Sequence, residues 1–397
     1  MQNEKIQETD TIANSRIKKI LFFHNTLPEY RIGWFMELDK RADVEFVFTN
    51  EKLNEKDYGF KIEYAKARNL KCTFLSEGIQ SVQELHCIMK NAGKYDFVEL
   101  PPIDSFRDVI YSGYIVCCCK KAKVSSGYFW EKWEAPKSRQ PLKRKIKNWI
   151  LRVVPKMIYK HVDVLFSVGT KNKEYFLSNG IDEEKIHWIP DVSETPKCEY
   201  FDLRAKYGIS KKSTLILYLG RILPQKGVAD LIQAYDLLDE ERKRSSFLLV
   251  AGDGRDLDNC KRLAEKLKLE NIRFIGSVNP KERGNYFEQC DIFVYPVNYW
   301  TGWVDVWGLT INEAVQHGKV VITTDAVGSA YELIENGVNG YRIRPGDIEQ
   351  LKNTLIEAAS SKIVKSTQIK DSEINKIYNF ANMAQLYINA IDVNFDT

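Results

Sequence analysis

The sequence predicts an α/β protein with two doubly wound, Rossmann-like domains. Short apolar runs rich in β-branched residues alternate with segments of helical periodicity, which is typical of parallel sheets covered by helices. The alternation is interrupted by a polar, proline-flanked passage at 191–200 and then starts again. We therefore predict a first domain over residues 1–192 and a second over residues 193–372.

The first domain begins after a polar stretch that ends near residue 16. Ligands of doubly wound sheets bind outside the carboxyl ends of the strands. The segments 24–30 and 128–134 directly follow predicted strands and are therefore candidate binding segments. The strands expected in this domain are 17–23, 44–49, 70–75, 95–98, 122–128, 162–168 and, more weakly, 185–190.

The second domain repeats the pattern of short strands and intervening helices. A last helical stretch within 373–397 lies far from the final strand, and we expect it to pack back on the first domain. The strands expected in the second domain are 214–219, 247–251, 272–275, 292–295, 320–323 and 340–343.

Composition excludes several classes of function. The chain has 397 residues, 44% hydrophobic and 28% charged, as a soluble globular protein does. A net charge of +4 is too small to indicate nucleic acid as a bulk partner. No run approaches the ~18 apolar residues of a membrane span, and the N-terminus lacks an apolar signal core. The eight cysteines show no metal-binding spacing, so we expect reduced thiols in a cytoplasmic protein without a metal site.

The stretch 305–314 carries the most informative pattern. It joins two predicted strands and contains a helix that begins at Gly308 and stops at Gly318. The start of a helix suits a phosphate, and the carboxylate of Glu313 reaches back toward that start. A carboxylate there favours hydroxyl partners, so with Asp305 the stretch indicates a sugar nucleotide. An ordinary crossover with both carboxylates in solvent is the alternative, and this stretch alone leaves both open.

Two cations follow the first strand of the second domain. Arg221 comes directly after that strand, and Lys226 begins a helix after a proline-containing loop. Both are placed to hold a diphosphate at the strand ends, since a cation at a helix start otherwise opposes the helix dipole. Asp256 and Asp258 resemble a metal-binding acidic pair, but helix N-capping is the favoured interpretation.

Residues 137–160 are strongly basic and contain no acidic residue. Apolar residues recur in this segment at helical spacing from Leu142 to Met157, although Pro155 interrupts the pattern. Such a segment is compatible with peripheral contact of 141–160 with an anionic membrane surface. A helix packed on its own domain with a solvated basic face is the favoured alternative.

Four motifs in order resemble the retaining glycosyltransferases of family 4. The resemblance covers 214–356, and it implies the GT-B architecture of two Rossmann-like domains facing a cleft. The first domain is similar only in outline, and it lacks the glycine-rich loop that many members have after their first strand. The motifs are Gly-Arg-Ile-Leu-Pro-Gln-Lys-Gly at 220–227, Val-Ala-Gly-Asp-Gly at 250–254, Trp-Gly-Leu-Thr-Ile-Asn-Glu-Ala at 307–314 and Val-Asn-Gly at 338–340.

The resemblance assigns roles to individual residues. Arg221 and Lys226 would bind the donor diphosphate, whose cradle the backbone of Gly308 and Leu309 would complete. Glu313 would bind the nucleotide ribose.

Further donor contacts follow from the same resemblance. The backbone at Gly276 and Ser277 would meet the base, and Asp305 would replace the glutamate that contacts the donor sugar. The shorter side chain departs from the family pattern and implies a water-bridged contact, a different sugar or a weakened site. The remaining predicted donor contacts are Gly220, Gly252 and Thr310.

The implied reaction is transfer of a hexose or related sugar with retention of anomeric configuration. The leaving diphosphate accepts the proton of the acceptor, and neither a cofactor nor a metal is expected. UDP or GDP is the expected nucleotide, and a saccharide or lipid-linked saccharide of bacterial surface polysaccharide is the expected acceptor. We expect the enzyme at the inner face of the membrane. The alternatives are a non-catalytic nucleotide-sugar-binding protein and another two-Rossmann enzyme such as an epimerase.

The acceptor is expected against the first domain. Aromatic residues suit sugar faces, although aromatics at strand ends more often belong to the core. The candidate acceptor contacts are Glu29, Tyr30, Arg31, Trp130, Glu131 and Trp133.

Overall fold

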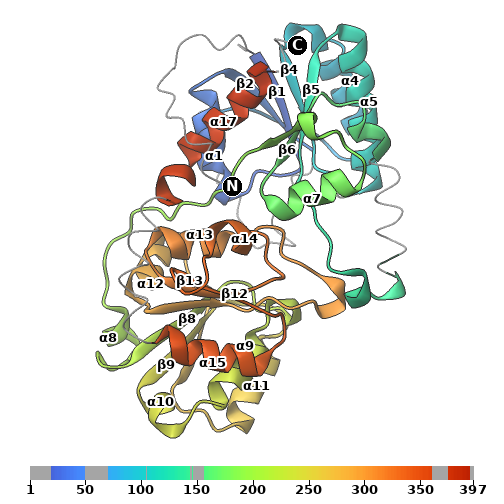
Figure 1. The fold of residues 1–397 in the computed structure, drawn as a ribbon. Helices are drawn as coiled ribbons and strands as arrows, with labels where there is room; N and C mark the ends of the chain where they lie inside the picture. The colour runs from blue at the N-terminus through green and yellow to red at the C-terminus, as the bar shows by residue number, and fades with distance from the viewer. Residues whose placement is uncertain are drawn as a thin grey trace. The chain divides into compact units, whose positions relative to one another are not determined.

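The computed structural model describes residues 19–49, 70–103, 105–143, 145, 156–359 and 374–393. It contains two compact units and two parallel sheets (Figure 1). Strand β7 (Ile186–Trp188) pairs in the first sheet, although its residues are grouped with the second unit. The first unit comprises Met1–Trp130, Met157–Phe166 and Ala384–Thr397, and the second comprises Glu131–Lys156 and Ser167–Met383. Residues 167–192, which the sequence placed with the first domain, are thus grouped with the second. The prediction of two Rossmann-like α/β domains is confirmed.

The first sheet has seven strands in the order β3-β2-β1-β4-β5-β6-β7. Its strands are β1 (Lys19–His24), β2 (Asp43–Phe48), β3 (Lys71–Phe74), β4 (Phe97–Leu100), β5 (Ser125–Phe129), β6 (Val164–Ser167) and β7 (Ile186–Trp188). The helices of this part of the chain are α1 (Glu29–Asp39), α4 (Ile79–Met89), α5 (Phe106–Ala122), α7 (Thr170–Ser178) and α17 (Phe380–Val393).

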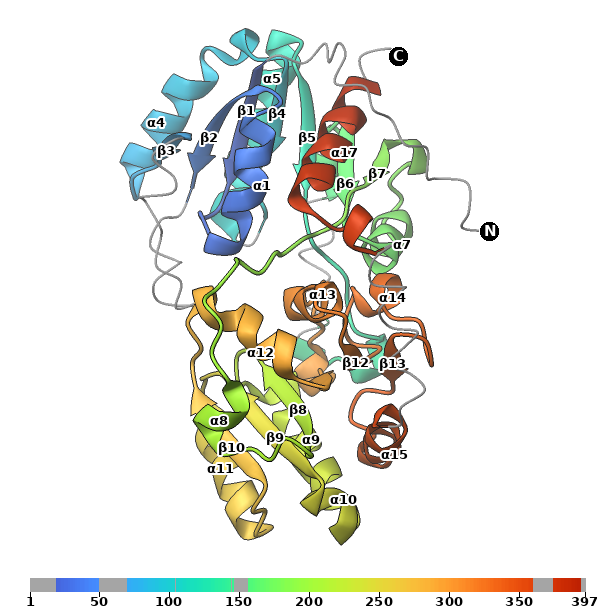
Figure 2. The same cartoon turned by 90° about the vertical axis from the view of Figure 1, so that its left-hand side faces the viewer.

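Helices α1 and α17 supply aromatic side chains to the core over strand β1. Helix α1 lies over the sheet (Figure 2), and the ring centroids of Trp34 and Phe22 are 5.5 Å apart. From α17, Tyr387 stacks on Phe166 at 4.5 Å and donates a 2.8 Å hydrogen bond to Oε2 of Glu99. Tyr387 and Glu99 are both fully buried, so the C-terminal helix completes the core of the first unit.

The second sheet has six strands in the order β10-β9-β8-β11-β12-β13, and every recorded pair is parallel. Its strands are β8 (Thr214–Leu219), β9 (Ser246–Ala251), β10 (Ile272–Gly276), β11 (Ile292–Tyr295), β12 (Val320–Thr324) and β13 (Gly340–Ile343). Its helices are α8 (Leu203–Tyr207), α9 (Val228–Asp236), α10 (Glu240–Arg244), α11 (Leu257–Lys266), α12 (Arg283–Gln289), α13 (Leu309–Gln316), α14 (Ala330–Leu333) and α15 (Ile348–Ala358).

The order of the second sheet has a switch point between β8 and β11. Strands follow the chain outward from β8 to β10, and the chain then returns to place β11 on the other side of β8. The connections leave β8 and β11 in opposite directions, which opens a crevice at their carboxyl ends. The loops 220–226 and 296–308 begin there.

Two predictions concern the membrane. Among the described residues, no helix combines the length and the apolar character needed to cross a bilayer. Leu142 and Met157 are exposed, but residues 144 and 146–155 lie outside the described residues, and with them most of the predicted membrane-contacting helix. Peripheral contact through 141–160 therefore stays a prediction.

Candidate donor site

The switch point between β8 and β11 contains a buried ion pair. Nζ of Lys226 lies 2.5 Å from Oδ2 of Asp305 and also donates a hydrogen bond to the hydroxyl of Tyr295. The Tyr295 hydroxyl in turn donates to the same Oδ2 at 2.7 Å. The three groups come from the η4 turn (Pro224–Lys226), the end of β11 and the loop after it, so the switch point brings them together.

The charges of this pair are only partly satisfied by the protein. Two of the three ammonium N–H groups of Lys226 are used, and both bonds to Asp305 end on Oδ2. No described residue bonds to Oδ1 of Asp305. The pair therefore retains a donor and an acceptor for a ligand.

Burial and charge oppose each other at this pair. Burial lowers the pKa of Lys226 against the attraction of Asp305. Burial would raise the pKa of Asp305, but the charge of Lys226 and the hydrogen bonds from Lys226 and Tyr295 hold it below its ordinary value. The charge of Lys226 and the two hydrogen bonds to Asp305 favour an ionised pair, because they stabilise the carboxylate in its charged form.

The backbone around Asp305 is held by the loop after β12. Asp305 N–H donates to Ala326 at 2.9 Å, and Gly328 N–H donates back to the Asp305 carbonyl at 2.9 Å. A Cβ atom at Gly328 would lie 1.8 Å from the carbonyl oxygen of Val306. Only glycine permits this approach, so Gly328 is a supporting residue that the sequence interpretation missed.

Helix α13 begins at Gly308, as predicted. Gly308 has a φ of +83°, and a Cβ atom there would lie 2.7 Å from a methyl carbon of Val327. The amides of Leu309 and Thr310 lie in the first turn, where N–H groups have no acceptor within the helix. Such N–H groups and the positive end of the helix dipole favour an anion.

Glu313 is completely buried one turn further along α13. Its Oε1 accepts a 2.6 Å hydrogen bond from Ser193 and lies 3.1 Å from the guanidinium of Arg283. Its Oε2 has no hydrogen-bond partner in the part of the chain that the structure describes. Burial raises the pKa of Glu313, against the charge of Arg283 and the bond from Ser193. The alternative of a solvated Glu313 on a helix surface is therefore wrong.

Other buried polar atoms lie beside Glu313. Asn312 is fully buried and accepts a 3.0 Å bond from the N–H of Ser193, whereas its Nδ2 and the hydroxyl of Thr310 have no partner among the described residues. Native proteins leave few such atoms unpaired. Sequence interpretation missed Ser193, Arg283 and Asn312, because their relation to Glu313 exists only in the folded chain.

The other predicted donor residues line the same edge of the sheet. Gly252 N–H donates to Gly276 at 2.7 Å, and a Cβ atom at Gly252 would lie 1.8 Å from the Gly220 carbonyl oxygen. Arg221 is exposed, and its charge contributes to lowering the pKa of Asp305. Ser277, after β10, is exposed.

The Asp256 side chain does not cap helix α11. Asp256 stands at the N-cap position, but its carboxylate accepts a 2.8 Å bond from the Asn259 side chain and none from the helix backbone. The described part of the chain contains no group of three or more metal-ligating side chains.

Some of the predicted acceptor residues are buried. In the first unit, Arg31 is 2% exposed and lies 5.0 Å from the ring centre of Phe129. Trp130 is also buried and packs on Tyr128. Burial favours a packing role for Arg31 and Trp130. Glu29 and Tyr30 are partly exposed at the start of α1, Glu131 is partly exposed in the second unit, and Trp133, buried there, packs edge-on against Tyr331.

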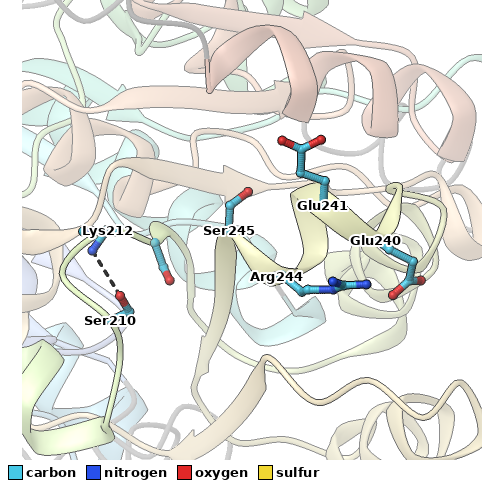
Figure 3. Close-up of a pocket in the computed structure, with 7 residues that line it drawn as sticks. Ser210, Lys212, Glu240, Glu241, Arg244 and Ser245 are labelled. Atoms are coloured by element: carbon cyan, nitrogen blue, oxygen red, sulfur yellow. Dashed lines mark hydrogen bonds between the residues drawn. The ribbon is translucent and has the colours of Figure 1, made fainter.

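A surface pocket lies at the opposite edge of the second sheet (Figure 3). Ser213 and Ser245 directly precede β8 and β9, so the pocket is at the amino ends of these strands, away from the switch point. Its residues are Ser210, Lys212, Ser213, Glu240, Glu241, Arg244 and Ser245, an ordinary mixed-charge surface.

Comparison with known proteins finds a family model that matches most of the second unit. Residues 200–374 match the family model described as glycosyl transferases group 1. This part of the chain belongs to that family. The match includes the predicted donor residues from Gly220 to Glu313.

Curated relatives are distant. A glycosyltransferase of Methanocaldococcus jannaschii without assigned function is 25% identical over 244 residues, 61% of this chain and 58% of that protein. The alpha-monoglucosyldiacylglycerol synthase of Acholeplasma laidlawii is 25% identical over 274 residues, 66% of this chain and 64% of that protein. These matches therefore span less than two thirds of the relatives' own length.

Solved structures extend the similarity to nearly the whole chain. The Anabaena protein HepE, crystallised with UDP and glucose, has a TM-score of 0.71 at 16% identity, with 95% of this chain and 100% of that chain covered. At this identity the likeness shows the fold alone, and it confirms the GT-B architecture of two Rossmann-like domains.

Proposed function

We propose that this glycosyltransferase moves a hexose or related sugar from a nucleotide-sugar donor to a saccharide or lipid-linked saccharide, with retention of anomeric configuration. The observation that carries the proposal is the unpartnered Oε2 of the buried Glu313, beside the start of α13. A buried acceptor without a donor costs free energy unless a ligand supplies one. A ribose hydroxyl on a nucleotide whose phosphates lie at the helix start is such a donor.

The remaining side chains account for the rest of a donor molecule. Arg221 and the unused N–H of Lys226 would hold the diphosphate together with the first turn of α13. Oδ1 of Asp305 would accept a hydrogen bond from a sugar hydroxyl. The diphosphate would then be surrounded by the positive charges of Arg221 and Lys226 and the positive end of the α13 dipole.

Catalysis would rest on stabilising the leaving group. As the bond from the anomeric carbon to the diphosphate oxygen breaks, negative charge grows on the diphosphate, and fixed cations and dipoles lower the barrier. Loss of one such contact commonly costs about 3 kcal/mol, or about a hundredfold in rate. The departing diphosphate oxygen would take the proton of the acceptor hydroxyl, while that hydroxyl oxygen forms the new bond on the same face.

The acceptor class draws support from a relative. The A. laidlawii protein is by name an alpha-monoglucosyldiacylglycerol synthase, which places a lipid acceptor among the relatives of this chain. We propose a lipid-linked saccharide of surface polysaccharide as the acceptor, with UDP or GDP as the donor nucleotide and no metal requirement.

The test is release of free nucleotide from UDP-, GDP- and ADP-sugars, with EDTA present and with lipid-linked saccharides as acceptors. We expect one donor to be consumed and the product to keep the anomeric configuration, as measured by NMR. Glu313→Ala and Arg221→Ala should each reduce the rate at least about a hundredfold. Their matched controls are Glu241→Ala and Arg244→Ala at the amino-end pocket, which should keep the wild-type rate. Binding without turnover would instead indicate a binding protein, and an altered sugar without transfer would indicate an epimerase.

A further inference from the structure

We propose that Tyr295 is a positioning residue of the donor site, whose hydroxyl sets Asp305 and Lys226 in place for the donor sugar and the diphosphate. The inference rests on the proposed function and adds to it a residue that neither the motifs nor the comparisons assign. Tyr295 ends strand β11 and is 4% exposed, so solvent does not compete for its hydroxyl.

The hydroxyl is the common partner of both charged groups. It accepts a hydrogen bond from Nζ of Lys226 and donates its own proton to Oδ2 of Asp305 at 2.7 Å. The Lys226 ammonium also lies 4.9 Å from the centre of the Tyr295 ring. A phenol hydroxyl has one proton to donate, so its direction is fixed: toward Asp305 and away from Lys226.

The ring itself is held on several sides. It stacks on Tyr218 with 6.3 Å between ring centroids and 18° between planes, and the Tyr218 hydroxyl donates a 2.7 Å bond to the carbonyl of Arg221. The Tyr295 carbonyl accepts a 3.0 Å bond from the hydroxyl of Thr323 on β12. Three neighbouring strands therefore fix the hydroxyl that the two charged side chains share.

The arrangement also explains how an aspartate serves at position 305. Its contacts to Lys226 and Tyr295, at 2.5 and 2.7 Å, leave no space for another methylene group between them. A glutamate at this position has to displace the hydroxyl of Tyr295 or turn away from Lys226. The tyrosine and the short carboxylate thus form a matched pair.

The first experiment compares Tyr295→Phe with Tyr235→Phe in the full-length enzyme. Tyr235 is equally buried in the same domain, and among the described residues its hydroxyl bonds only to backbone carbonyls and to Ser246. With the best donor and acceptor, we expect Tyr295→Phe to lower kcat about tenfold to a hundredfold, the usual effect of removing a hydrogen bond to a charged group. Tyr235→Phe should leave kcat unchanged.

The pH profile separates positioning from general damage. Without the proton from Tyr295, the carboxyl of Asp305 loses a stabilising donor and its pKa rises, so the acid limb of kcat/KM should move to higher pH only in Tyr295→Phe. In an Asp305→Asn background, Tyr295→Phe should add little further loss, because the two groups act together.

A second pair of variants tests the match directly. Asp305→Glu alone should lower kcat, and Tyr295→Phe combined with Asp305→Glu should be more active than Asp305→Glu alone. Wild-type kcat and an unmoved acid limb in Tyr295→Phe, or no recovery in the double variant, would overturn the inference and leave the proposed function standing. Absence of turnover by the wild-type enzyme with every donor would remove the proposed function and this inference together.

Discussion

Glu313→Gln should weaken nucleotide binding and at the same time stabilise the unliganded protein. The substitution keeps the size of the side chain and an oxygen that accepts from Ser193, but it removes a fully buried negative charge. Proteins that use a buried charge for a ligand hold it at a cost to their own stability, so the two measurements should move in opposite directions.

The binding loss follows from the unpartnered Oε2 of Glu313. A hydrogen bond from a ribose hydroxyl to a charged acceptor contributes about 1.5–3 kcal/mol, and about 1.4 kcal/mol is tenfold in affinity. We therefore expect the Kd for the nucleotide to rise about tenfold to a hundredfold, measured by calorimetry.

The stability gain follows from the environment of the carboxylate. Burial raises the pKa of Glu313 in the folded protein, and the guanidinium of Arg283, whose side chain is 22% exposed, does not offset this. Removing this charge should therefore stabilise the unliganded protein at neutral pH, because the ionised carboxylate is the form that burial disfavours. A gain of about 1 kcal/mol corresponds to about 2–4 °C in the Tm of a domain of this size.

The sign of the pH dependence provides an internal check. A carboxyl with a raised pKa contributes its full stability below the ordinary glutamate pKa and loses it as pH rises through the folded value. The Tm difference between Glu313→Gln and wild type should therefore vanish near pH 4 and grow toward neutral pH. A variant whose Tm and nucleotide affinity both fall would refute the reasoning and make Glu313 a structural residue.

Three further variants test other features. Lys226→Met leaves the carboxylate of Asp305 without its cation and should lower the free energy of unfolding by about 3–5 kcal/mol in urea titrations; a loss below about 1 kcal/mol would contradict the buried pair. Gly308→Ala combines a φ of +83° with a 2.7 Å contact and should cost more than Gly337→Ala, which has a φ of +76° and open space around it; equal losses of about 1 kcal/mol would mean that the close approach is relieved. Burial raises the pKa of Glu99 to about 8 from 4.5, so its contribution to stability should decline as pH rises between these values, and Glu99→Gln should flatten that slope in denaturation curves at pH 5, 7 and 9.

Local patterns in the sequence were sufficient to predict the fold and some residues of the candidate donor site. The apolar runs of both sheets predicted parallel strands, and the positions of Arg221, Lys226 and Gly308 at strand and helix ends followed from short motifs. These features depend on neighbours within a few residues, and periodicity and glycine placement report such neighbours directly.

Contacts between distant segments could not be predicted in the same way. Ser193 and Glu313 are 120 positions apart in the chain, yet their side chains are 2.6 Å apart in the fold. In the sequence, Tyr295 is one residue of an apolar run that predicts a strand. Only the fold shows that its hydroxyl lies between Lys226 and Asp305. Arg31 and Trp130 were predicted as acceptor contacts against the first domain, but the packing of the first unit buries both.

The position of α17 in the chain has a consequence for folding. Tyr387 fills the aromatic core over β1, but a ribosome makes it after every residue of the second unit. Until residues 384–393 emerge, Glu99 lacks its hydroxyl partner, and the core around Phe22 and Phe166 lacks one ring. The core of the first unit can therefore be completed only after the whole second unit has been synthesised. Truncation before residue 384 should thus destabilise the first unit, although most of that unit lies at the other end of the sequence.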